Sequence, residues 1–432
     1  MKKIFFLTIL FFSISYIRGQ YVLIPDSNFR NVLLNKGYGL CFDSTHTMID
    51  TICAGILDST SLYIVGSNIF SIEGVHYFKH LTKLNCNNNH LSIIPLLPPS
   101  LIQLYCSNNN IVALTVIPPN LTYLDIEQNN VSSLPPIPQS LESLFISNNN
   151  FVDLPVLPPS LFTLFCHGNS IDSFPSLPSH LNTLSCGQQS IRHFPSLPAS
   201  LKYFYCPDAD LDSLPILPDS LKNLDCNGNR LTYIPPLSDS LQTLNCSNNQ
   251  LTFLPVLPAL VTYLDCSSNQ LTYIPSLPDS LFWFHCGSNS QLKCLPRFKR
   301  IVYMNFNSTG ITCLPNYGDV TNSYPILDSV PLCLIGNANG CTVYTNEQNM
   351  LENLSISVNP NPTNSKLEIE FQNVASQSLQ ISIRNISGQI LNNLYRSASS
   401  KFELDVSVLS SGMYFLVVQS EGENVVKKFV KQ

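Results

Sequence analysis

The feature that most constrains this chain is an internal repeat with a period of 20 residues. Between residues 81 and 280 the pattern LxxLxCxxNxLxxLPxLPxS returns ten times, and less regular copies continue to about residue 315. A fixed period of this length is typical of a solenoid, in which each repeat forms one turn and packs against its neighbours. The 432 residues therefore need not form the two or three globular domains that such a length ordinarily indicates.

The spacing inside each repeat predicts one short strand per turn. A leucine column that starts at Leu84 is followed two residues later by a column that starts at Cys86. Residues two apart in a strand point to the same face, so both columns are expected to point inward. The return leg carries two prolines per turn, as at Pro215 and Pro218, which remove amide donors and exclude an ordinary helix. We expect an extended, polyproline-like convex side.

The cysteine column predicts filling of the interior rather than chemistry. The same position also accepts Ile126, Ile146 and Phe306, and free cysteine is among the most buried residue types. A straight column of sulfurs offers neither four converging metal ligands nor the short Cβ separation of a disulfide. We predict free, buried and inert thiols, with no metal and no cofactor. The members are Cys86, Cys106, Cys166, Cys186, Cys206, Cys226, Cys246, Cys266 and Cys286.

The pattern LxxLxCxxNxL, as at residues 221–231, resembles the leucine-rich repeat, and the LPxLP return segment is similar to the 20-residue class of bacterial secreted effectors. The resemblance implies a member of the α/β repeat class that is mostly β, with a parallel β-sheet. It also implies that the asparagine three residues after each cysteine bonds the backbone of adjacent turns. Gln189 and Ala209 interrupt that asparagine ladder in two consecutive repeats, so we predict a weak joint at residues 188–210.

The ends of the solenoid need covers for their apolar faces. Residues 26–37 predict a capping helix, with Asp26 as the N-cap and with Phe29, Val32 and Leu33 at helical spacing. In the first turn, Leu62, Ile64 and Ile69 are expected to point inward.

Six cysteines lie outside the repeat column and are disulfide candidates. Cys41 and Cys53 are expected to pair. Cys294 and Cys313 occupy equivalent places in consecutive turns and could bridge, while Cys333 and Cys341 flank a loop and could bridge locally. The other pairings of these four cysteines stay open.

Residues 1–19 combine early lysines with an apolar run, which is the pattern of a secretory signal peptide, and no later run approaches the length of a membrane helix. The formal net charge is -6, with the acidic excess before residue 354. This charge argues against nucleic acid and against anionic membranes as partners. The predicted organisation is a signal peptide at 1–19, an N-terminal cap at 20–61, a solenoid at 62–316, a linker at 317–353 and a β-sandwich at 354–432.

The last segment alternates apolar and polar residues in short runs separated by turns, which predicts a small C-terminal β-sandwich. Its sequence motifs NPNP, NISGQIL, DVSVLSSGMYFLVV and KKFVKQ closely resemble those of the type A C-terminal sorting domain of the type IX secretion system of Bacteroidota. The resemblance implies export to the outer cell surface or the medium, with lipopolysaccharide anchoring after removal of the domain as one outcome. The motif residues are Asn359, Pro360, Pro362, Gly388, Gly412, Tyr414, Lys427 and Lys428.

Strand positions that alternate with the buried columns are expected to face solvent on the concave side. Large aromatic residues and carboxylates gather there, among them Asp125, Asp225 and Asp265. Such rings also pack across strands in sheets that bind nothing. The alternative is a binding surface, because tyrosine and tryptophan supply rigid contact area with a polar tip. The candidate ligand-binding residues are Tyr105, Tyr123, Phe145, Phe165, Tyr203, Tyr205, Tyr263, Trp283, His285 and Tyr303.

Catalysis is not expected, because the histidines are scattered and no HExxH, GxSxG, phosphate-binding loop or Cys/His motif is present. No catalytic residue is therefore assigned. The sequence predicts a secreted or surface-displayed protein whose partners are the type IX secretion machinery and an unidentified macromolecule, either a protein or a glycan, bound through the aromatic and acidic concave face. A glycan ligand, as in an adhesin, is the alternative.

Overall fold

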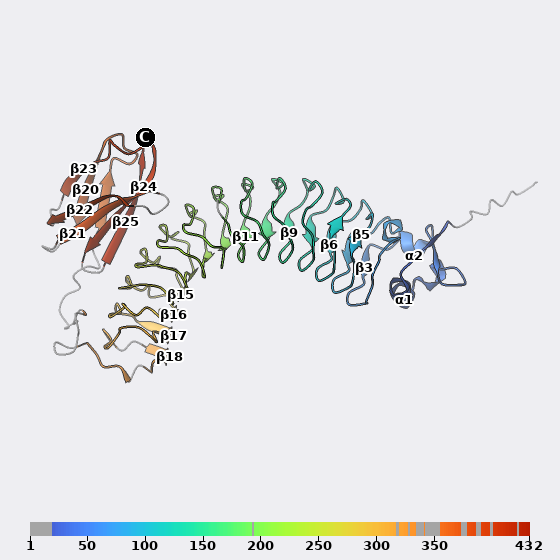
Figure 1. Ribbon diagram of the computed structural model, residues 1–432, viewed down its shortest axis with the longest axis horizontal. Helices are drawn as coiled ribbons and strands as arrows, with labels where there is room; N and C mark the ends of the chain where they lie inside the picture. Colours follow the sequence, from blue (N-terminus) through green and yellow to red (C-terminus); the bar gives the residue numbers. More distant parts are fainter. Residues whose placement is uncertain are drawn as a thin grey trace, which may run out of the picture. The chain divides into compact units, whose positions relative to one another are not determined.

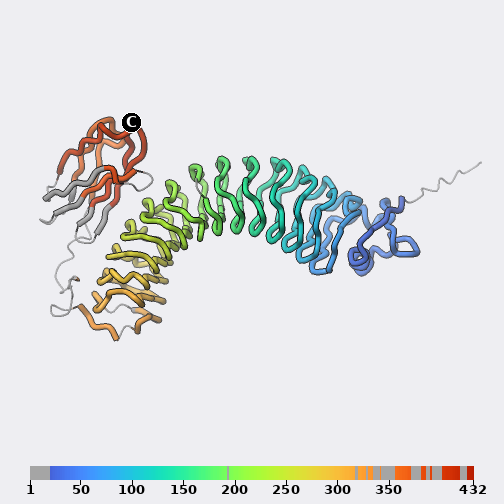
Figure 2. Tube along the Cα trace, in the orientation of Figure 1, coloured from blue at the N-terminus to red at the C-terminus, as the bar shows by residue number. Residues whose placement is uncertain are grey.

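The computed structural model describes residues 20–191, 194–316, 319–326, 329–333, 341, 355–372, 378–385, 390–397, 401–420 and 423–432. The predicted signal peptide and most of the predicted linker lie outside these residues. The chain divides into two compact units, Met1–Leu121 and Thr122–Gln432, and each is described by itself. Within each unit the backbone winds through successive similar turns (Figures 1 and 2).

The first unit begins with the predicted capping helix. Helix α1 covers Ser27–Asn35, and the Oδ1 atom of Asp26 accepts a hydrogen bond from the Phe29 amide at 2.8 Å. Phe29 and Leu33 are fully buried, so the apolar stripe of the helix covers the end of the solenoid as expected. The other carboxylate oxygen of Asp26 accepts from the amides of Phe70 and Ser71, which joins the helix start to the first turn.

The remaining elements of this unit are short. Strands β3, β4 and β6 run parallel in that order, and the predicted disulfide joins Cys41 to Cys53. Leu62, Ile64 and Ile69 are buried, which confirms their inward position in the first turn. The elements are β1 (Tyr21–Leu23), η1 (Tyr38–Cys41), β2 (Met48–Asp50), α2 (Ala54–Leu57), β3 (Ser61–Tyr63), η2 (Val75–Tyr77), β4 (Lys83–Asn85), β5 (Ile93–Ile94), β6 (Gln103–Tyr105) and β7 (Ala113–Leu114).

In the second unit each turn contributes one strand to a parallel sheet. Residues 20 positions apart are direct neighbours, as in the pair Leu164 and Leu184. Most strands are three residues long, and their central residue is buried while the flanking two are half-buried. The strands are β8 (Tyr123–Asp125), β9 (Ser143–Phe145), β10 (Thr163–Phe165), β11 (Thr183–Ser185), β12 (Tyr203–Tyr205), β13 (Asn223–Asp225), β14 (Thr243–Asn245), β15 (Tyr263–Asp265), β16 (Trp283–His285), β17 (Arg300–Asn305) and β18 (Asp319–Tyr324).

The cysteine column lies in the interior as predicted. All nine of its cysteines are free and buried, and the substitutes Ile126, Ile146 and Phe306 are also buried. Several thiols donate to a carbonyl oxygen of the next turn, for example Cys86 Sγ to Tyr105 O at 3.3 Å and Cys166 Sγ to Ser185 O at 3.4 Å. The column therefore fills the core and adds a weak bond between turns.

The asparagine ladder joins each turn to its neighbours. The Asn229 amide nitrogen donates to Cys206 O and Cys226 O, both at 2.9 Å. Its Oδ1 atom accepts from the amides of Ala209 and Leu211, both at 3.0 Å. A buried asparagine thus satisfies four backbone bonds across two turns, and losing it would leave buried polar groups unpaired.

The two predicted interruptions of this ladder differ. Gln189 keeps two of the bonds, because its amide donates to Cys186 O at 2.8 Å and its Oε1 atom accepts from the Ile171 amide at 3.3 Å. Ala209 has no polar side chain, and the Ile191 amide donates to the Ala209 carbonyl at 3.1 Å. The ladder is therefore weakened chiefly at Ala209.

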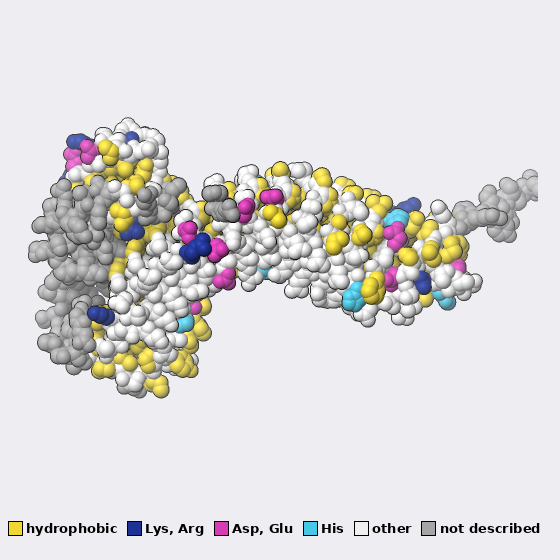
Figure 3. Space-filling view, in the orientation of Figure 1, with side chains coloured by type: hydrophobic (Ala, Val, Ile, Leu, Met, Phe, Trp, Pro, Cys, Tyr) yellow, Lys and Arg dark blue, Asp and Glu magenta, His cyan; other side chains and the backbone are white. Residues whose placement is uncertain are grey.

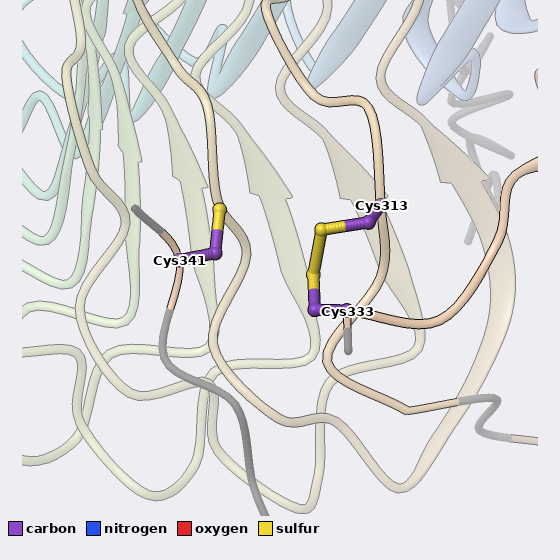
Figure 4. A group of neighbouring side chains, drawn as sticks. All are labelled: Cys313, Cys333 and Cys341. Atoms are coloured by element: carbon purple, nitrogen blue, oxygen red, sulfur yellow. A yellow bond between two sulfur atoms is a disulfide. The ribbon is translucent and has the colours of Figure 1, made fainter. Parts of the chain in front are cut away.

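The four cysteines at the far end of the repeats pair differently from the prediction. Cys313 bonds Cys333 (Figure 4), and Cys294 bonds Cys341. The sequence predicts instead Cys294 with Cys313 and Cys333 with Cys341. Leu314 and Leu332 form a parallel bridge, so Cys333 is the neighbour of Cys313 on the following turn. The Cys341 sulfur lies 3.2 Å from the Lys293 carbonyl oxygen, next to Cys294 in the chain.

The C-terminal segment is the predicted sandwich. One sheet has the order β19-β20-β23 and the other has the order β22-β21-β24-β25, all antiparallel. Its strands are β19 (Ser355–Asn359), β20 (Lys366–Gln372), β21 (Ser378–Arg384), β22 (Ile390–Ser397), β23 (Lys401–Asp405), β24 (Gly412–Ser420) and β25 (Glu423–Lys431). Both sheets contribute to one core, which includes Leu367, Ile369, Leu404, Ile383, Leu416 and Phe429.

Candidate functional site

The candidate binding surface is the side of the parallel sheet that faces away from the buried columns, and we call it the outer sheet face. Each three-residue strand places its first and third side chains on this face, because side chains alternate along a strand. Parallel in-register pairing then stacks equivalent positions from turn to turn. In the second unit the face consists of the first and third residues of β8 to β16, followed by Tyr303 and Asn305 of β17.

A first group of rings lies on β8, β9 and β10. The ring centroids of Tyr123 and Phe145 are 5.1 Å apart, and those of Phe145 and Phe165 are 5.0 Å apart with planes at 79°. These distances are typical of favourable aromatic pairs. The three predicted residues therefore form one continuous apolar cluster.

Tyr105 belongs to the first unit and has a different environment there. The Lys83 ammonium lies over the rings of Tyr105 and Tyr63, at 5.0 Å and 5.7 Å from their centroids. This cation–π arrangement was missed from sequence. Lys83 is the first residue of its strand and so shares the column of the predicted rings, which is the signal that could have found it.

A second group forms a stack on β15, β16 and β17. The planes of Tyr263 and Trp283 differ by 14° with centroids 6.0 Å apart, and those of Trp283 and Tyr303 differ by 17° at 3.8 Å. Tyr324 on β18 continues the group at 6.2 Å from Tyr303. Tyr324 was not predicted, because β18 follows β17 after 19 residues and the period is lost there. Trp283 and Tyr303 therefore stack closely face to face, while Tyr263 lies parallel to Trp283 at a larger separation.

The two predicted tyrosines of β12, Tyr203 and Tyr205, are separated from this stack by two ring-free strands. The registers place Asn223 and Thr243 between Tyr203 and Tyr263 in one column. Asp225 and Asn245 occupy the neighbouring column between Tyr205 and Asp265. The outer sheet face thus has a polar gap between two aromatic walls.

On this face a carboxylate oxygen of Asp265 lies 3.4 Å from Nδ1 of His285. The two side chains form an ion pair when the imidazole is protonated. The other oxygen of Asp265 accepts from the amide and the hydroxyl of Ser267. Burial would raise the pKa of Asp265, but the bonds from His285 and Ser267 reverse this effect and the pKa is lowered. The predicted residue His285 therefore has a defined partner.

Asp225 has the opposite electrostatics although it occupies the same column. Its Oδ1 atom accepts from the amide and the side chain of Asn227, at 3.1 Å and 2.8 Å. Desolvation outweighs these bonds and raises the pKa of Asp225. In the described part of the chain no lysine, arginine or histidine forms an ion pair with this carboxylate.

Charged side chains are sparse over the solenoid turns in the view of Figure 3. This agrees with a composition in which only 12% of the residues are charged. Uncharged side chains therefore make up most of the surface that this view shows.

One sulfur cluster has the spacing of metal ligands. The Sγ atoms of Cys313, Cys333 and Cys341 all lie within 4.8 Å of one another (Figure 4). Metal binding requires thiolates, whereas each of these sulfurs belongs to a disulfide. The cluster is therefore a covalent staple at the end of the repeats.

The export motif brings distant residues together in the sandwich. The Asn361 side chain donates to Lys428 O at 3.0 Å and accepts from the Val430 amide at 2.9 Å. Thr363 also pairs with the end of β25 through the backbone. The NPNP segment and the basic ending, which carries Lys427 and Lys428, thus form one structural feature. Gly388 lies outside the described residues.

Comparison with known families agrees with this architecture. Residues 357–432 match the model of the secretion system C-terminal sorting domain, and residues 219–259 match a leucine-rich-repeat model of two copies. The solenoid is a leucine-rich-repeat fold. The protein is accordingly a leucine-rich-repeat protein that ends in a type IX secretion sorting domain, and this domain indicates export to the cell surface or the medium.

Solved structures support the same class. YopM from Yersinia enterocolitica WA-314 is 30% identical with a TM-score of 0.50, and the match covers 56% of this chain and 55% of that one. The leucine-rich effector YopM from Yersinia pestis is 27% identical with a TM-score of 0.52, covering 64% and 88%. The chain thus spans about half the length of the first of these relatives. A search of curated proteins finds no match.

Among the described residues no helix has both the length and the apolar character needed to cross a membrane.

Proposed function

We infer that this protein is exported by the type IX secretion system and binds a protein partner through the outer sheet face, without catalysing a reaction. The observation that carries the proposal is the stack of Tyr263, Trp283 and Tyr303. These rings are half-buried on a face that the solenoid core does not use. Rigid aromatic side chains with polar tips are the residues that dominate binding energy at protein interfaces.

The ring geometry favours a protein over a glycan. A sugar ring stacks on an open aromatic face, whereas one face of Trp283 is covered by Tyr303 and the other is turned toward Tyr263. Apart from the face of Tyr263 that is turned away from Trp283, the stack therefore offers ring edges, phenol hydroxyls and an indole N–H to a ligand. These groups suit a protein surface, which offers both polar and apolar contacts.

The experiment captures surface proteins on the full secreted chain and compares three variants. Trp283→Ala and Phe145→Ala should each weaken capture of the same partner at least tenfold. Truncating an aromatic hot-spot residue at an interface often costs about 2 kcal/mol of binding free energy, which is more than a tenfold change in affinity. Val156→Ala is the matched control, since Val156 is 87% exposed on a return segment outside the face. Thermal unfolding checks that all variants are folded.

Partner capture that is unchanged in both aromatic variants would contradict the assignment of this face. A glycan array run with the same proteins provides the alternative outcome. Specific glycan binding that depends on Trp283 would replace the protein partner with a carbohydrate.

A further inference from the structure

The polar gap on the outer sheet face has the chemistry of a site for one planar cation. Trp283 stacks on one face of Tyr263, so the opposite face of Tyr263 is turned toward β14, where the equivalent residue is Thr243. Thr243 carries no ring and is followed by Asn245 on the same strand. From Tyr203 to Tyr263 the gap spans three strand spacings, or about 14 Å.

Two carboxylates border the spot beside the free face of Tyr263. Asp225 lies on β13 and Asp265 on β15, so they flank Asn245 in the adjacent column. Burial raises the pKa of Tyr263, and the charges of Asp265 and Asp225 both raise it further. The phenol and the two carboxylates therefore converge on one region of the sheet.

The two carboxylates are not equally satisfied by the protein. Asp265 already has His285 and Ser267 as partners. Asp225 is half-buried and bonded to neutral side chains, those of Asn227 and Asn245, and its charged form is disfavoured by desolvation and by the charge of Asp208 on the preceding turn. A partly desolvated carboxylate gains most from an external cation, because a paired charge offsets the cost of burial.

We propose that this gap binds an arginine side chain of the protein partner, with the guanidinium stacked on the free face of Tyr263 and hydrogen-bonded to Asp225. The inference rests on the proposed function and names the chemistry of the partner. Guanidinium fits because it is planar, stacks on aromatic faces and presents several donors to a carboxylate. Lys202 and Lys222 immediately precede β12 and β13, next to the first residues of these strands, whereas Asp225 is the third residue of β13.

The site can be tested without knowing the partner, because Trp283 is the only tryptophan in the sequence and lies against Tyr263. The full secreted protein is titrated with N-acetyl-arginine N-methylamide while Trp283 fluorescence is recorded. We expect a saturable change with a Kd on the order of millimolar, as for a single side chain. The citrulline analogue has nearly the same shape without the charge, and it should bind at least tenfold more weakly.

Variants then assign the site. Asp225→Asn and Tyr263→Phe address the carboxylate and the ring, and we expect Asp225→Asn to weaken arginine binding at least tenfold while Tyr263→Phe retains it. Asp219→Asn, an exposed aspartate on a return segment, should leave binding unchanged. Thermal unfolding of each variant separates loss of the site from loss of the fold.

Equal binding of the arginine and citrulline compounds, or equal weakening by Asp219→Asn, would overturn the proposal. Equal binding of the lysine analogue would overturn the guanidinium part of it. These outcomes are separate from the proposed function: if partner capture still depends on Trp283 and Phe145 when the arginine compound does not bind, the face remains a binding surface and only its arginine site is rejected.

Discussion

At the scale of single residues, the outer sheet face holds two aspartates whose pKa values move in opposite directions. The pKa of Asp225 is raised, chiefly by desolvation, whereas the partners of Asp265 lower its pKa. A binding surface commonly retains a charge that costs stability, because the same charge serves the ligand. The charge of Asp265 therefore stabilises the folded state, and the charge of Asp225 destabilises it.

We predict opposite effects of the two Asp→Asn substitutions on thermal stability at pH 7. Asp225→Asn should raise the Tm slightly, because the charged form is disfavoured in the folded state, and the difference should vanish as the pH falls below about 4, where the carboxyl is protonated. Asp265→Asn should lower the Tm, because its charged form is favoured, and this loss should also vanish at low pH. Each effect should be roughly 0.5 kcal/mol. Differential scanning calorimetry measures both effects over a pH range from about 3 to about 7, which includes the ordinary aspartate pKa of about 4. Effects of the same sign at pH 7 would contradict the assignment.

A second prediction concerns the thiols of the cysteine column. Burial raises the pKa of Cys166 to about 12, so its reactive thiolate is scarce at neutral pH. Iodoacetamide should leave the native protein unlabelled and should label nine cysteines after unfolding without reduction. Intact-mass spectrometry gives both numbers. Rapid labelling of the native protein would place the column outside the interior.

Sequence reasoning worked well for residues whose role follows from the period. The buried columns and the strand positions of the rings on the outer sheet face follow from the period, and the helix cap Asp26 follows from a local helix-start pattern. It missed Lys83 and Tyr324, since the first is not aromatic and the second lies beyond the regular repeats. The partners of Asp265 and the lack of a cation beside Asp225 depend on side-chain placement, which periodicity does not contain.

At the scale of elements, one turn of the solenoid is the structural unit. A three-residue strand gives few hydrogen bonds by itself, so each turn depends on the asparagine that reaches into the next. The residue before the ladder asparagine has a left-handed backbone, with φ of 54° at Asn108 and 67° at Gly228. Asparagine, glycine and other short polar residues tolerate this geometry, which explains why they recur there.

Restoring the ladder at its weakest point should stabilise the molecule. Ala209→Asn supplies donors for the carbonyls of Cys186 and Cys206 and an acceptor for the Ile191 amide, by analogy with Asn229. We expect a gain of about 1 kcal/mol in the free energy of unfolding and slower cleavage by trypsin or subtilisin between residues 188 and 210. Chemical denaturation and limited proteolysis measure the two effects.

The matched control for this variant is Ala199→Asn, at an exposed position of a return segment. It should change neither stability nor the cleavage pattern. First cuts of the wild-type protein far from residues 188–210 would show that the interruption is not the weakest joint.

The element level also shows where sequence reasoning fails. Strand positions follow from the repeat, and the helix and sandwich follow from local patterns. The pairing of Cys294 with Cys341 does not, because it depends on how a non-repetitive segment returns to an earlier turn. Pairing between consecutive turns does occur, but one turn later than predicted, in Cys313 and Cys333.

At the scale of the whole molecule, the chain combines a repeat that presents a surface with a small domain that determines where the surface is delivered. The sandwich has its own core, drawn from both of its sheets. Its export motif is not a linear tag, since Asn361 is bonded to the last strand. Recognition by the secretion machinery is therefore expected to require the folded domain.

We predict that Asn361→Ala reduces export several-fold and leaves more of the protein in the periplasm. The substitution removes the bonds to Lys428 O and from the Val430 amide. Immunoblots of periplasmic, surface and medium fractions measure the distribution. Asn364→Ala, at an exposed site near the same motif, is the control and should be exported normally. Normal export of both variants would show that the NPNP connection is dispensable.

The in-register pairing of adjacent strands affects how the gene for this protein can change during evolution. Residues 20 apart are paired throughout β8 to β16, so removing or duplicating one whole period leaves the surviving neighbours in alignment. Unequal recombination between near-identical stretches of coding DNA can thus lengthen or shorten the molecule in single steps. Each such step shifts the spacing between ring-bearing and ring-free positions, and a lineage can change the exposed sheet without first losing a foldable product.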